Sequence, residues 1–175
     1  MLKVLRLGHR KTRDARITTH VCLAARAFGA SEVIISGEKD KKLIENVNDV
    51  TKRWGGPFKT SYQKDWKKII KKWEGEIIHL TMYGIPIQKI IENIRKSEND
   101  KLIIVGGPRV PGEIFKLADF NVAVTNQPHS EVSALAVFLH MFFNGEELEK
   151  RFENAEIRII PSKNSKKIKE IRGPK

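Results

Sequence analysis

Short apolar segments rich in β-branched residues recur along this chain, and amphipathic segments separate them. The apolar segments lie at residues 3–7, 32–36, 58–61, 76–82, 101–107 and 121–126. Their continuous apolar character predicts strands buried on both faces of a sheet. The other segments carry apolar residues at three- to four-residue spacing, which predicts helices over 13–29, 39–54, 66–73, 85–96 and 130–143. This alternation predicts an α/β fold with a mostly parallel sheet and helices on both faces.

The alternating pattern stops before the end of the chain. With 175 residues, 40% of them hydrophobic, the chain is long enough to bury one sizeable core. Asn144 and Gly145 are typical of a helix end. The residues after them predict a short helix, a strand over 156–160 and a basic segment after Pro161. We therefore expect one α/β domain over residues 1–143 and a short, basic C-terminal extension over residues 144–175.

Several protein classes are excluded by what the sequence lacks. No run of eighteen or more apolar residues is present, and the N-terminus shows no secretory signal pattern, so we expect a soluble, cytoplasmic protein with no membrane association. The single cysteine, Cys22, cannot form an internal disulfide and falls in an apolar helical pattern, which is typical of a core residue. No His or Cys pairs occur at metal-ligand spacing, so we expect no metal site.

Positive charge is concentrated at the two ends of the sequence. The net charge is +12, to which residues 1–26 contribute +6 (seven Lys or Arg, one acid) and residues 161–175 contribute +5 (six and one). Such a distribution favours a polyanionic partner, and we expect both ends to line one nucleic-acid surface. The alternative is a solvated helix and a disordered lysine tail that only aid solubility.

Polar and glycine-rich residues follow three of the predicted strands. In open α/β sheets, ligands bind beyond the carboxyl ends of the strands, so the loops after residues 80, 105 and 125 are the candidate binding loops. The loop Gly106–Gly112 matches neither a P-loop nor a dinucleotide-binding pattern and is a ligand loop or an ordinary turn. In the third loop, Asn126 or Ser130 can cap the following helix. His129 is a catalytic candidate or a surface turn residue.

Three segments resemble the ordered motifs of the SPOUT superfamily of RNA methyltransferases. They are AFGASEVII (27–35), LIIVGGPRVPG (102–112) and NVAVTNQPHSEVSALAVFLH (121–140). Residues 5–30, together with HLTMYG (79–84) and VGGPRVP (105–111), are more specifically similar to the archaeal tRNA (cytidine(56)-2'-O)-methyltransferase family. Each motif is weak alone, but their order and spacing are specific, and the resemblance covers residues 1–143.

The resemblance implies a parallel sheet whose C-terminal part forms a trefoil knot. It also implies S-adenosyl-L-methionine as cofactor, tRNA as substrate, and a homodimer whose active site uses both subunits. The cofactor-binding positions it implies are Leu80, Gly106, Gly107, Pro108, Arg109, Val110, Val124, Thr125, Asn126, Gln127, Pro128, His129, Ser130 and Glu131.

One motif departs from the commoner SPOUT ribose methyltransferases. Those enzymes carry an Asn and, six residues later, an Arg ahead of the AFG element. Ile17 and Leu23 occupy these positions here, so the role of that arginine cannot be transferred to its usual place.

Charged residues of the first predicted helix are the alternative catalytic candidates. His9, Arg13, Arg16 and His20 recur at four, three and four residues, so on one helix they would share a face. We expect this face to hold tRNA phosphates and the target ribose, with Arg16 and Arg13 stabilising charge and His20 as a candidate base. The alternative is that all of them only contact phosphates.

The sequence thus predicts an S-adenosylmethionine-dependent tRNA ribose 2'-O-methyltransferase acting on cytidine 56 of the T-loop. Two alternatives stay open: a SPOUT methyltransferase acting on another RNA position or base, and a non-catalytic RNA-binding α/β domain.

Overall fold

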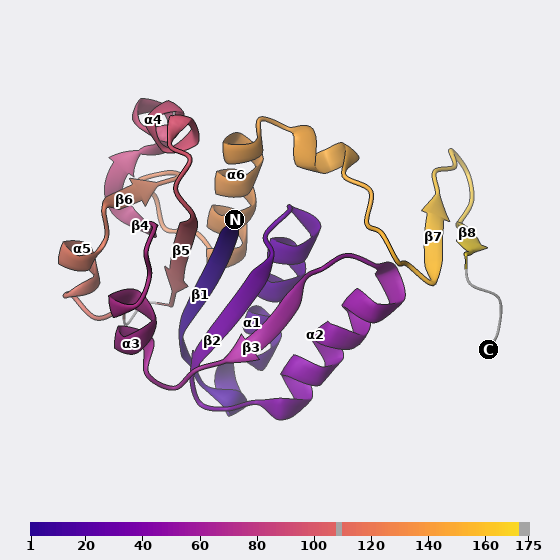
Figure 1. Ribbon diagram of the computed structural model, residues 1–175, viewed down its shortest axis with the longest axis horizontal. Helices are drawn as coiled ribbons and strands as arrows, with labels where there is room; N and C mark the ends of the chain where they lie inside the picture. Colours follow the sequence, from indigo (N-terminus) through magenta and orange to yellow (C-terminus); the bar gives the residue numbers. More distant parts are fainter. Residues whose placement is uncertain (108–109, 172–175) are drawn as a thin grey trace.

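A parallel sheet forms the centre of the protein in a computed structural model that describes residues 1–107 and 110–171. Its strand order is β3-β2-β1-β5-β4-β6, and all neighbouring strands pair in parallel. The strands are β1 (Leu2–His9), β2 (Glu32–Gly37), β3 (Lys59–Tyr62), β4 (Glu76–Pro86), β5 (Lys101–Gly106) and β6 (Phe120–Ala123). Each predicted strand is present, which confirms the α/β class (Figure 1).

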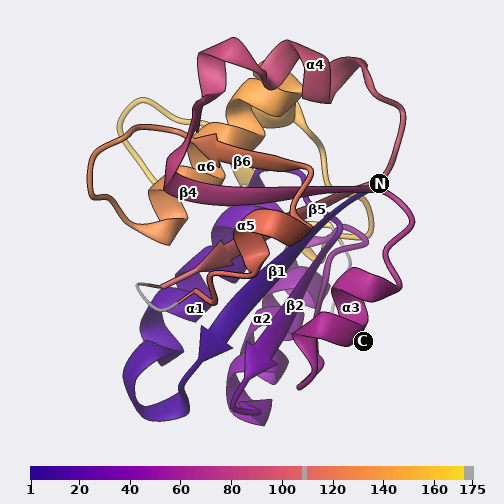
Figure 2. The same ribbon diagram turned by 90° about the vertical axis from the view of Figure 1, so that its left-hand side faces the viewer.

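Helices cover both faces of the sheet, as predicted (Figures 1 and 2). One core contains residues of α1 (Lys11–Ala27), α2 (Lys41–Trp54), α4 (Ile91–Lys96) and α6 (Glu131–Phe143). The other contains residues of α3 (Trp66–Lys71) and of α5 (Ile114–Leu117), a short helix that the sequence did not predict. Because successive side chains of a strand alternate, Val4 of β1 lies in the first core and Leu5 in the second.

Local hydrogen bonds fix where α6 begins and ends. The Ser130 hydroxyl accepts a hydrogen bond from the Ser133 backbone N–H at 3.4 Å, so Ser130 is the N-cap, one of the two predicted alternatives. The other alternative, Asn126, instead donates its side-chain amide to the Met82 and Gly84 carbonyls at 2.6 and 3.2 Å. The helix ends as predicted, at Asn144, which adopts a left-handed conformation (φ 57°).

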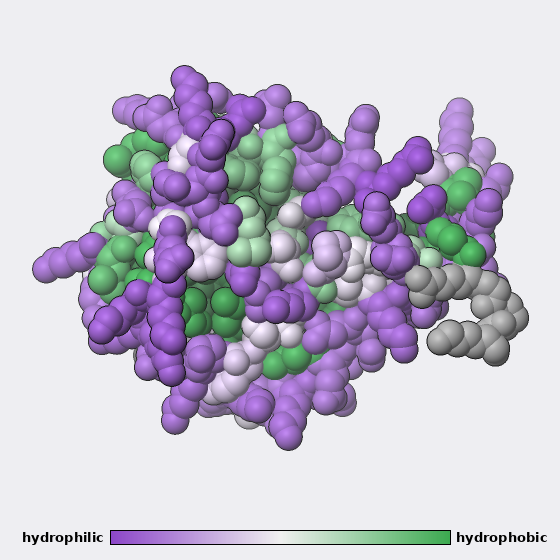
Figure 3. Space-filling model, in the orientation of Figure 1, coloured by the Kyte–Doolittle hydropathy of each residue, from purple (hydrophilic) through white to green (hydrophobic). Residues whose placement is uncertain are grey.

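The C-terminal extension contains a hairpin that the sequence prediction missed in part. After the short 3-10 helix η2 (Glu146–Glu149), strand β7 (Ile157–Ile160) pairs in antiparallel fashion with β8 (Lys167–Glu170). Only β7 was predicted, because β8 has a single apolar residue, Ile168, between two lysines and therefore shows no apolar strand pattern. Ile159 and Ile168 pair across the hairpin and are 61% and 60% exposed. Most of the face in view in Figure 3 is hydrophilic.

The start of α1 and the C-terminal hairpin lie at different edges of the sheet, whereas Arg26 at the end of α1 packs over the Phe152 ring of the extension. The hairpin contacts the C-terminal end of α2, where the Arg53 carbonyl accepts from the Glu156 backbone N–H at 3.0 Å. The start of α1 follows the carboxyl end of β1, at the opposite edge of the sheet. The start of α1 and the hairpin therefore lie at opposite edges of the sheet in one protomer, and the expectation that both ends of the sequence line one nucleic-acid surface stays a prediction.

The burial of Cys22 and the length of the helices are two further features of the fold. Cys22 is fully buried in the core, as predicted, and burial raises the pKa of its thiol to about 12. None of the helices in the described residues is both long and apolar enough to cross a membrane.

Candidate active site

Two adjoining cavities lie at the carboxyl ends of the strands. The first, called here the loop cavity, has a volume of about 400 Å³ and lies between the end of β4, the end of β5 and the start of α6. The second, called the α1 cavity, has a volume of about 740 Å³ and lies between the ends of β1 and β2, the start of α1 and the start of α3. Both are lined by Gly107, Val110 and Glu131.

The loop cavity contains most of the residues that were predicted to bind the cofactor. Eight of them line it: Leu80, Gly106, Gly107, Val110, Pro128, His129, Ser130 and Glu131. Val124, Thr125, Asn126 and Gln127 do not line it, although Asn126 fastens the chain after β6 to the bend of β4. Pro108 and Arg109 lie outside the described residues. The three loops, which are far apart in the sequence, are thus brought together as predicted.

The apolar walls of the loop cavity were missed by the sequence prediction. They include Val105, Phe115 and Ala134. Only the fold reveals them: the pattern of the elements that contain Val105 and Ala134 predicts burial and not which cavity they line, and Phe115 lies on α5, which was not predicted. Gly106 shapes this wall, because a Cβ atom there would lie 2.5 Å from a methyl group of Val110. A glycine at the end of β5 therefore lets Val110 fold over the strand end and line both cavities.

His79 joins β4 to β6 at the loop cavity. It is 1% exposed, its Nδ1 lies 2.9 Å from Oδ1 of Asn121, and its ring packs edge-on against Phe115. Burial lowers the pKa of His79, which favours the neutral ring, and a neutral ring with its proton on Nδ1 donates to Asn121. His79 is therefore a structural element of this wall.

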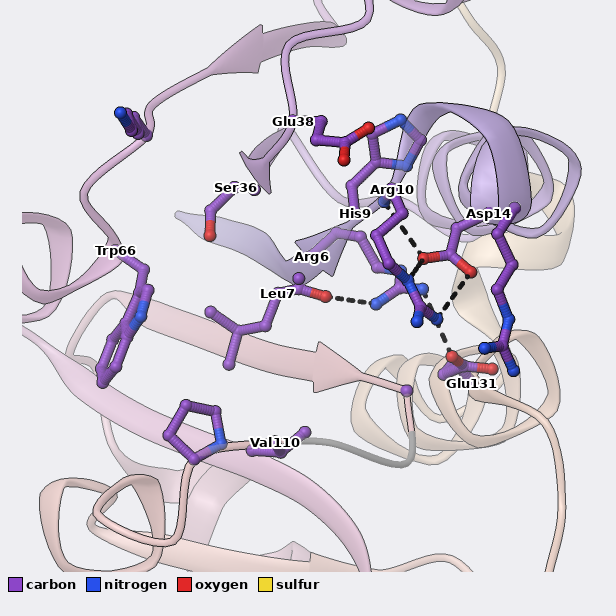
Figure 4. Close-up of a pocket in the computed structure, with 16 residues that line it drawn as sticks. Arg6, Leu7, His9, Arg10, Asp14, Ser36, Glu38, Trp66, Val110 and Glu131 are labelled. Carbon is purple, nitrogen blue, oxygen red and sulfur yellow. Dashed lines mark hydrogen bonds and ion pairs between the residues drawn. The ribbon is translucent and has the colours of Figure 1, made fainter.

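A buried arginine lies between the two cavities. Arg6 of β1 is 2% exposed, lies 3.4 Å from the Glu131 carboxylate and donates to the Leu7 carbonyl (Figure 4). Burial lowers the pKa of Arg6, and the charge of Glu131 opposes this shift. An arginine between the apolar residues of a strand predicts a buried acidic partner. The sequence does not show which acidic residue that is.

The first turn of α1 is organised by a second ion pair. The Arg10 guanidinium donates to both oxygens of Asp14, at 2.9 and 3.2 Å, and the Arg10 backbone N–H donates to the same carboxylate at 3.1 Å. These hydrogen bonds hold the pKa of Asp14 below its ordinary value. Arg10 and Asp14 form one wall of the α1 cavity (Figure 4).

The predicted helical face is wrong at His9, because α1 begins only at Lys11. His9 is the last residue of β1 and is 1% exposed. Its Nδ1 lies 2.9 Å from the Thr18 hydroxyl, and its Nε2 lies 3.7 Å from an Asp40 oxygen. Burial lowers the pKa of His9, although Asp40 opposes the shift. His9 therefore stabilises the turn between β1 and α1 through buried contacts with Thr18 and Asp40.

The other three residues of that face lie on α1 and are exposed: Arg13, Arg16 and His20. Arg13 lines the α1 cavity, whereas Arg16 and His20 line neither cavity. None of the three forms an ion pair with another residue in the part of the chain that the structure describes. Ile17 and Leu23, which stand in place of the usual motif residues, are partly buried.

The chain has the same fold class as solved SpoU and TrmH methyltransferases. The structure is similar to the TrmH/SpoU tRNA-modifying enzyme of A. aeolicus, with a TM-score of 0.61 and 12% identity over 85% of this chain and 76% of that one. It is also similar to the SpoU methyltransferase AviRb of Streptomyces viridochromogenes, crystallised with its cofactor AdoMet. There the TM-score is 0.58 and the identity 11%, over 83% of this chain and 57% of that one.

The sequence places the chain within one family of that class. It belongs to the tRNA ribose 2'-O-methyltransferase family aTrm56, whose model matches residues 54–169. A relative from Methanothermobacter thermautotrophicus, named tRNA (cytidine(56)-2'-O)-methyltransferase, is 60% identical over 97% of both chains. A relative of the same name from Thermococcus kodakarensis is 53% identical over 98% of both chains.

Proposed function

We propose that this protein transfers a methyl group from S-adenosyl-L-methionine to the 2'-hydroxyl of cytidine 56 in tRNA. One observation carries the proposal: a cavity made of three strand-end loops adjoins a second cavity that contains arginines of β1 and α1. Relatives that are 60% and 53% identical over nearly the whole chain carry the name of this activity. A binding domain without catalysis is not favoured, since these relatives carry the name of a methyltransferase.

The loop cavity has the composition that S-adenosylmethionine requires. Leu80, Val105 and Ala134 supply apolar walls for an adenine ring, and the backbone of the loops at Gly106 and Pro128 supplies hydrogen-bonding groups. The glycine at 106 keeps this backbone accessible, because any side chain there collides with Val110. When bound, the cofactor supplies a methyl group activated by a sulfonium. The residues of this chain must then hold the ribose and manage its charge.

The chemistry at the ribose requires loss of the hydroxyl proton and stabilisation of the oxygen as it becomes negative. A ribose hydroxyl is almost fully protonated at neutral pH, so proton acceptance by a side chain is worth about 10²- to 10⁴-fold in rate. Arg13 and Arg16 carry permanent positive charge that no described residue neutralises, and we assign them to stabilise the oxygen and the adjacent phosphate. His20 on the same face is the candidate proton acceptor.

The placement of Arg16 and His20 favours a homodimer. Because they line neither cavity of their own protomer, they would act at the cavities of a second copy. Within each copy, residues 1–143 would form the methyltransferase domain and residues 144–175 the basic extension. We also expect a trefoil knot in the C-terminal part, as the resemblance to the SPOUT methyltransferases implies. Action on tRNA implies a cytoplasmic location.

Methyl transfer from tritiated S-adenosylmethionine to unmodified tRNA transcripts, followed by nucleotide mapping, tests the function. We expect one methyl group, on the ribose of cytidine 56. A transcript that already carries a 2'-O-methyl group there is the matched control and should accept none. Label at another nucleotide or on a base would replace the proposed target, and absence of cofactor binding by calorimetry would leave only a binding domain.

A further inference from the structure

The α1 cavity contains polar and aromatic groups that the proposed methyl transfer does not use. Its volume is about 740 Å³, and it meets the loop cavity at Gly107, Val110 and Glu131. A molecule bound in it would therefore lie next to whatever occupies the loop cavity. The groups that line it indicate what kind of molecule that is.

Ser36 presents to the α1 cavity a hydroxyl that forms no hydrogen bond with a described residue. The residue is 1% exposed and lies at the end of β2. Figure 4 shows the hydroxyl oxygen directed into the cavity, between Trp66 and Leu7. The hydroxyl is open to the cavity and is therefore available to a polar ligand. A hydroxyl can both donate to and accept from the edge of a nucleobase.

The backbone beside Ser36 is held rigidly. Gly37 has φ 115°, and a Cβ atom there would lie 2.4 Å from the His9 carbonyl oxygen, so β2 approaches β1 more closely than another residue would allow. The Tyr62 hydroxyl donates to the Gly37 carbonyl at 2.9 Å. The backbone position of Ser36 beside the cavity is therefore fixed by the fold.

Trp66 supplies an aromatic wall. It is the first residue of α3, and it lies across the cavity from Arg10 and Asp14 (Figure 4). The ring is partly buried, and its N–H donates to no described residue. The Lys67 ammonium lies 5.4 Å from the ring centroid and is paired with the Glu113 carboxylate at 2.8 Å, so it is not free for an anion. The aromatic surface itself suits the base of a nucleotide.

Unpaired cations lie on the same cavity. Arg6 and Arg10 are paired with Glu131 and Asp14, but Arg13 and Lys64 form no ion pair with any described residue. Both are exposed, so they can reach an anion at the mouth of the cavity. Phosphate is the anion that RNA presents to such side chains.

We propose that the α1 cavity binds the target nucleotide after it has left the base stack of the T-loop. Its phosphate lies at Arg13 and Lys64, its base packs against Trp66, and a polar edge of the base is hydrogen-bonded by Ser36. This inference rests on the proposed function and adds the residues that place and select the nucleotide. Enzymes that act on a stacked nucleotide take it out of the stack into a pocket of this kind.

Ser36→Ala tests the hydrogen bond. Because the hydroxyl has no protein partner, the variant should keep the melting temperature of the wild type and its affinity for S-adenosylmethionine. We expect KM for tRNA to rise about five- to tenfold, the effect of one lost hydrogen bond. Ser31→Ala is the matched control: its hydroxyl donates to the Leu2 carbonyl at 2.8 Å, so it should lower stability and leave KM unchanged. An unchanged KM for Ser36→Ala would overturn the proposal.

Fluorescence of Trp66 tests the aromatic contact. The chain has three tryptophans, so Trp54→Phe combined with Trp73→Phe leaves Trp66 as the sole emitter. Titration with a tRNA transcript should quench its emission, and the same transcript with an abasic site at position 56 should quench it much less. Equal quenching by both transcripts, or by neither, would contradict base contact with Trp66.

Lys64→Ala tests the phosphate contact and has Lys71→Ala on α3 as its matched control. Loss of a phosphate contact should raise KM for tRNA and reduce the salt dependence of binding by about one unit of slope for Lys64 only. Equal effects of both substitutions would contradict the assignment. Failure of this inference is distinguishable from failure of the proposed function, since wild-type methylation at cytidine 56 is measured separately.

Discussion

Substitution of Glu131 by Gln should destabilise the protein by leaving the Arg6 guanidinium buried without a countercharge. Arg6 is 2% exposed and lies 3.4 Å from the carboxylate. Removal of one partner from a fully buried ion pair costs about 3–5 kcal/mol. The Glu131 side chain is 20% exposed, and the negative charge of Asp14 also stabilises the Arg6 guanidinium. We therefore expect a smaller loss in the free energy of unfolding, of about 2–3 kcal/mol. In a chain of 175 residues this corresponds to a melting temperature lower by about 4–12 °C.

Differential scanning calorimetry of single and double variants measures this effect. Glu146→Gln is the matched control, because that residue is exposed, and it should change the free energy of unfolding by less than about 0.5 kcal/mol. The double variant Arg6→Met with Glu131→Leu removes both charges and should recover most of the loss, since apolar pairs of similar volume replace buried ion pairs with little cost. The buried pair does not contribute as the geometry indicates if Glu131→Gln and Glu146→Gln have the same melting temperature. The same conclusion follows if the effects of Arg6→Met and Glu131→Leu on the free energy of unfolding are simply additive.

Three further outcomes are expected. Arg16→Ala should lower kcat by about tenfold or more with cofactor affinity unchanged, whereas a bulky residue at Gly107 should weaken S-adenosylmethionine binding first; calorimetry and methyl-transfer kinetics separate the two, and equal losses of cofactor affinity would reject the division of roles. Cys22, with its pKa near 12, should react with a thiol reagent only at the rate of unfolding, and fast labelling of the native protein would contradict its burial. Stability should fall in two ranges of pH. Because the folded-state pKa of His79 is lowered, the unfolded chain takes up a proton that the folded one does not, so stability declines as pH falls through about 6.5; because the pKa of Asp14 is also lowered, its contribution is complete above about pH 5 and is lost as pH falls through its folded value. A urea series from pH 8 to 3 measures both. His79→Asn should reduce but not abolish the loss near pH 6.5, because the pKa of His9 is lowered too, and Asp14→Asn should reduce the acidic loss, to which Glu32 and Glu76 also contribute.

The sequence by itself determined the elements of this protein. Periodicity and β-branched content depend only on neighbouring residues, which is why all six strands of the parallel sheet, the burial of Cys22 and Ser130 as one of two candidate caps were predicted, whereas the short elements α5 and β8 were not. The loops at the strand ends could also be assigned, because all strands of a parallel sheet end at the same edge. The family's motifs then added the cofactor, which periodicity does not encode.

Tertiary structure alone decided how distant residues meet. The strand order puts β1 between β2 and β5, and this order brings Arg6 to Glu131 and Ser36 to the same cavity as Trp66. The tertiary structure also places His9 at the buried end of β1, whereas the sequence spacing had predicted that His9 shares an exposed helix face. Spacing along a chain specifies which side of an element a residue occupies, whereas the partner on that side depends on long-range pairing and packing that no local pattern contains.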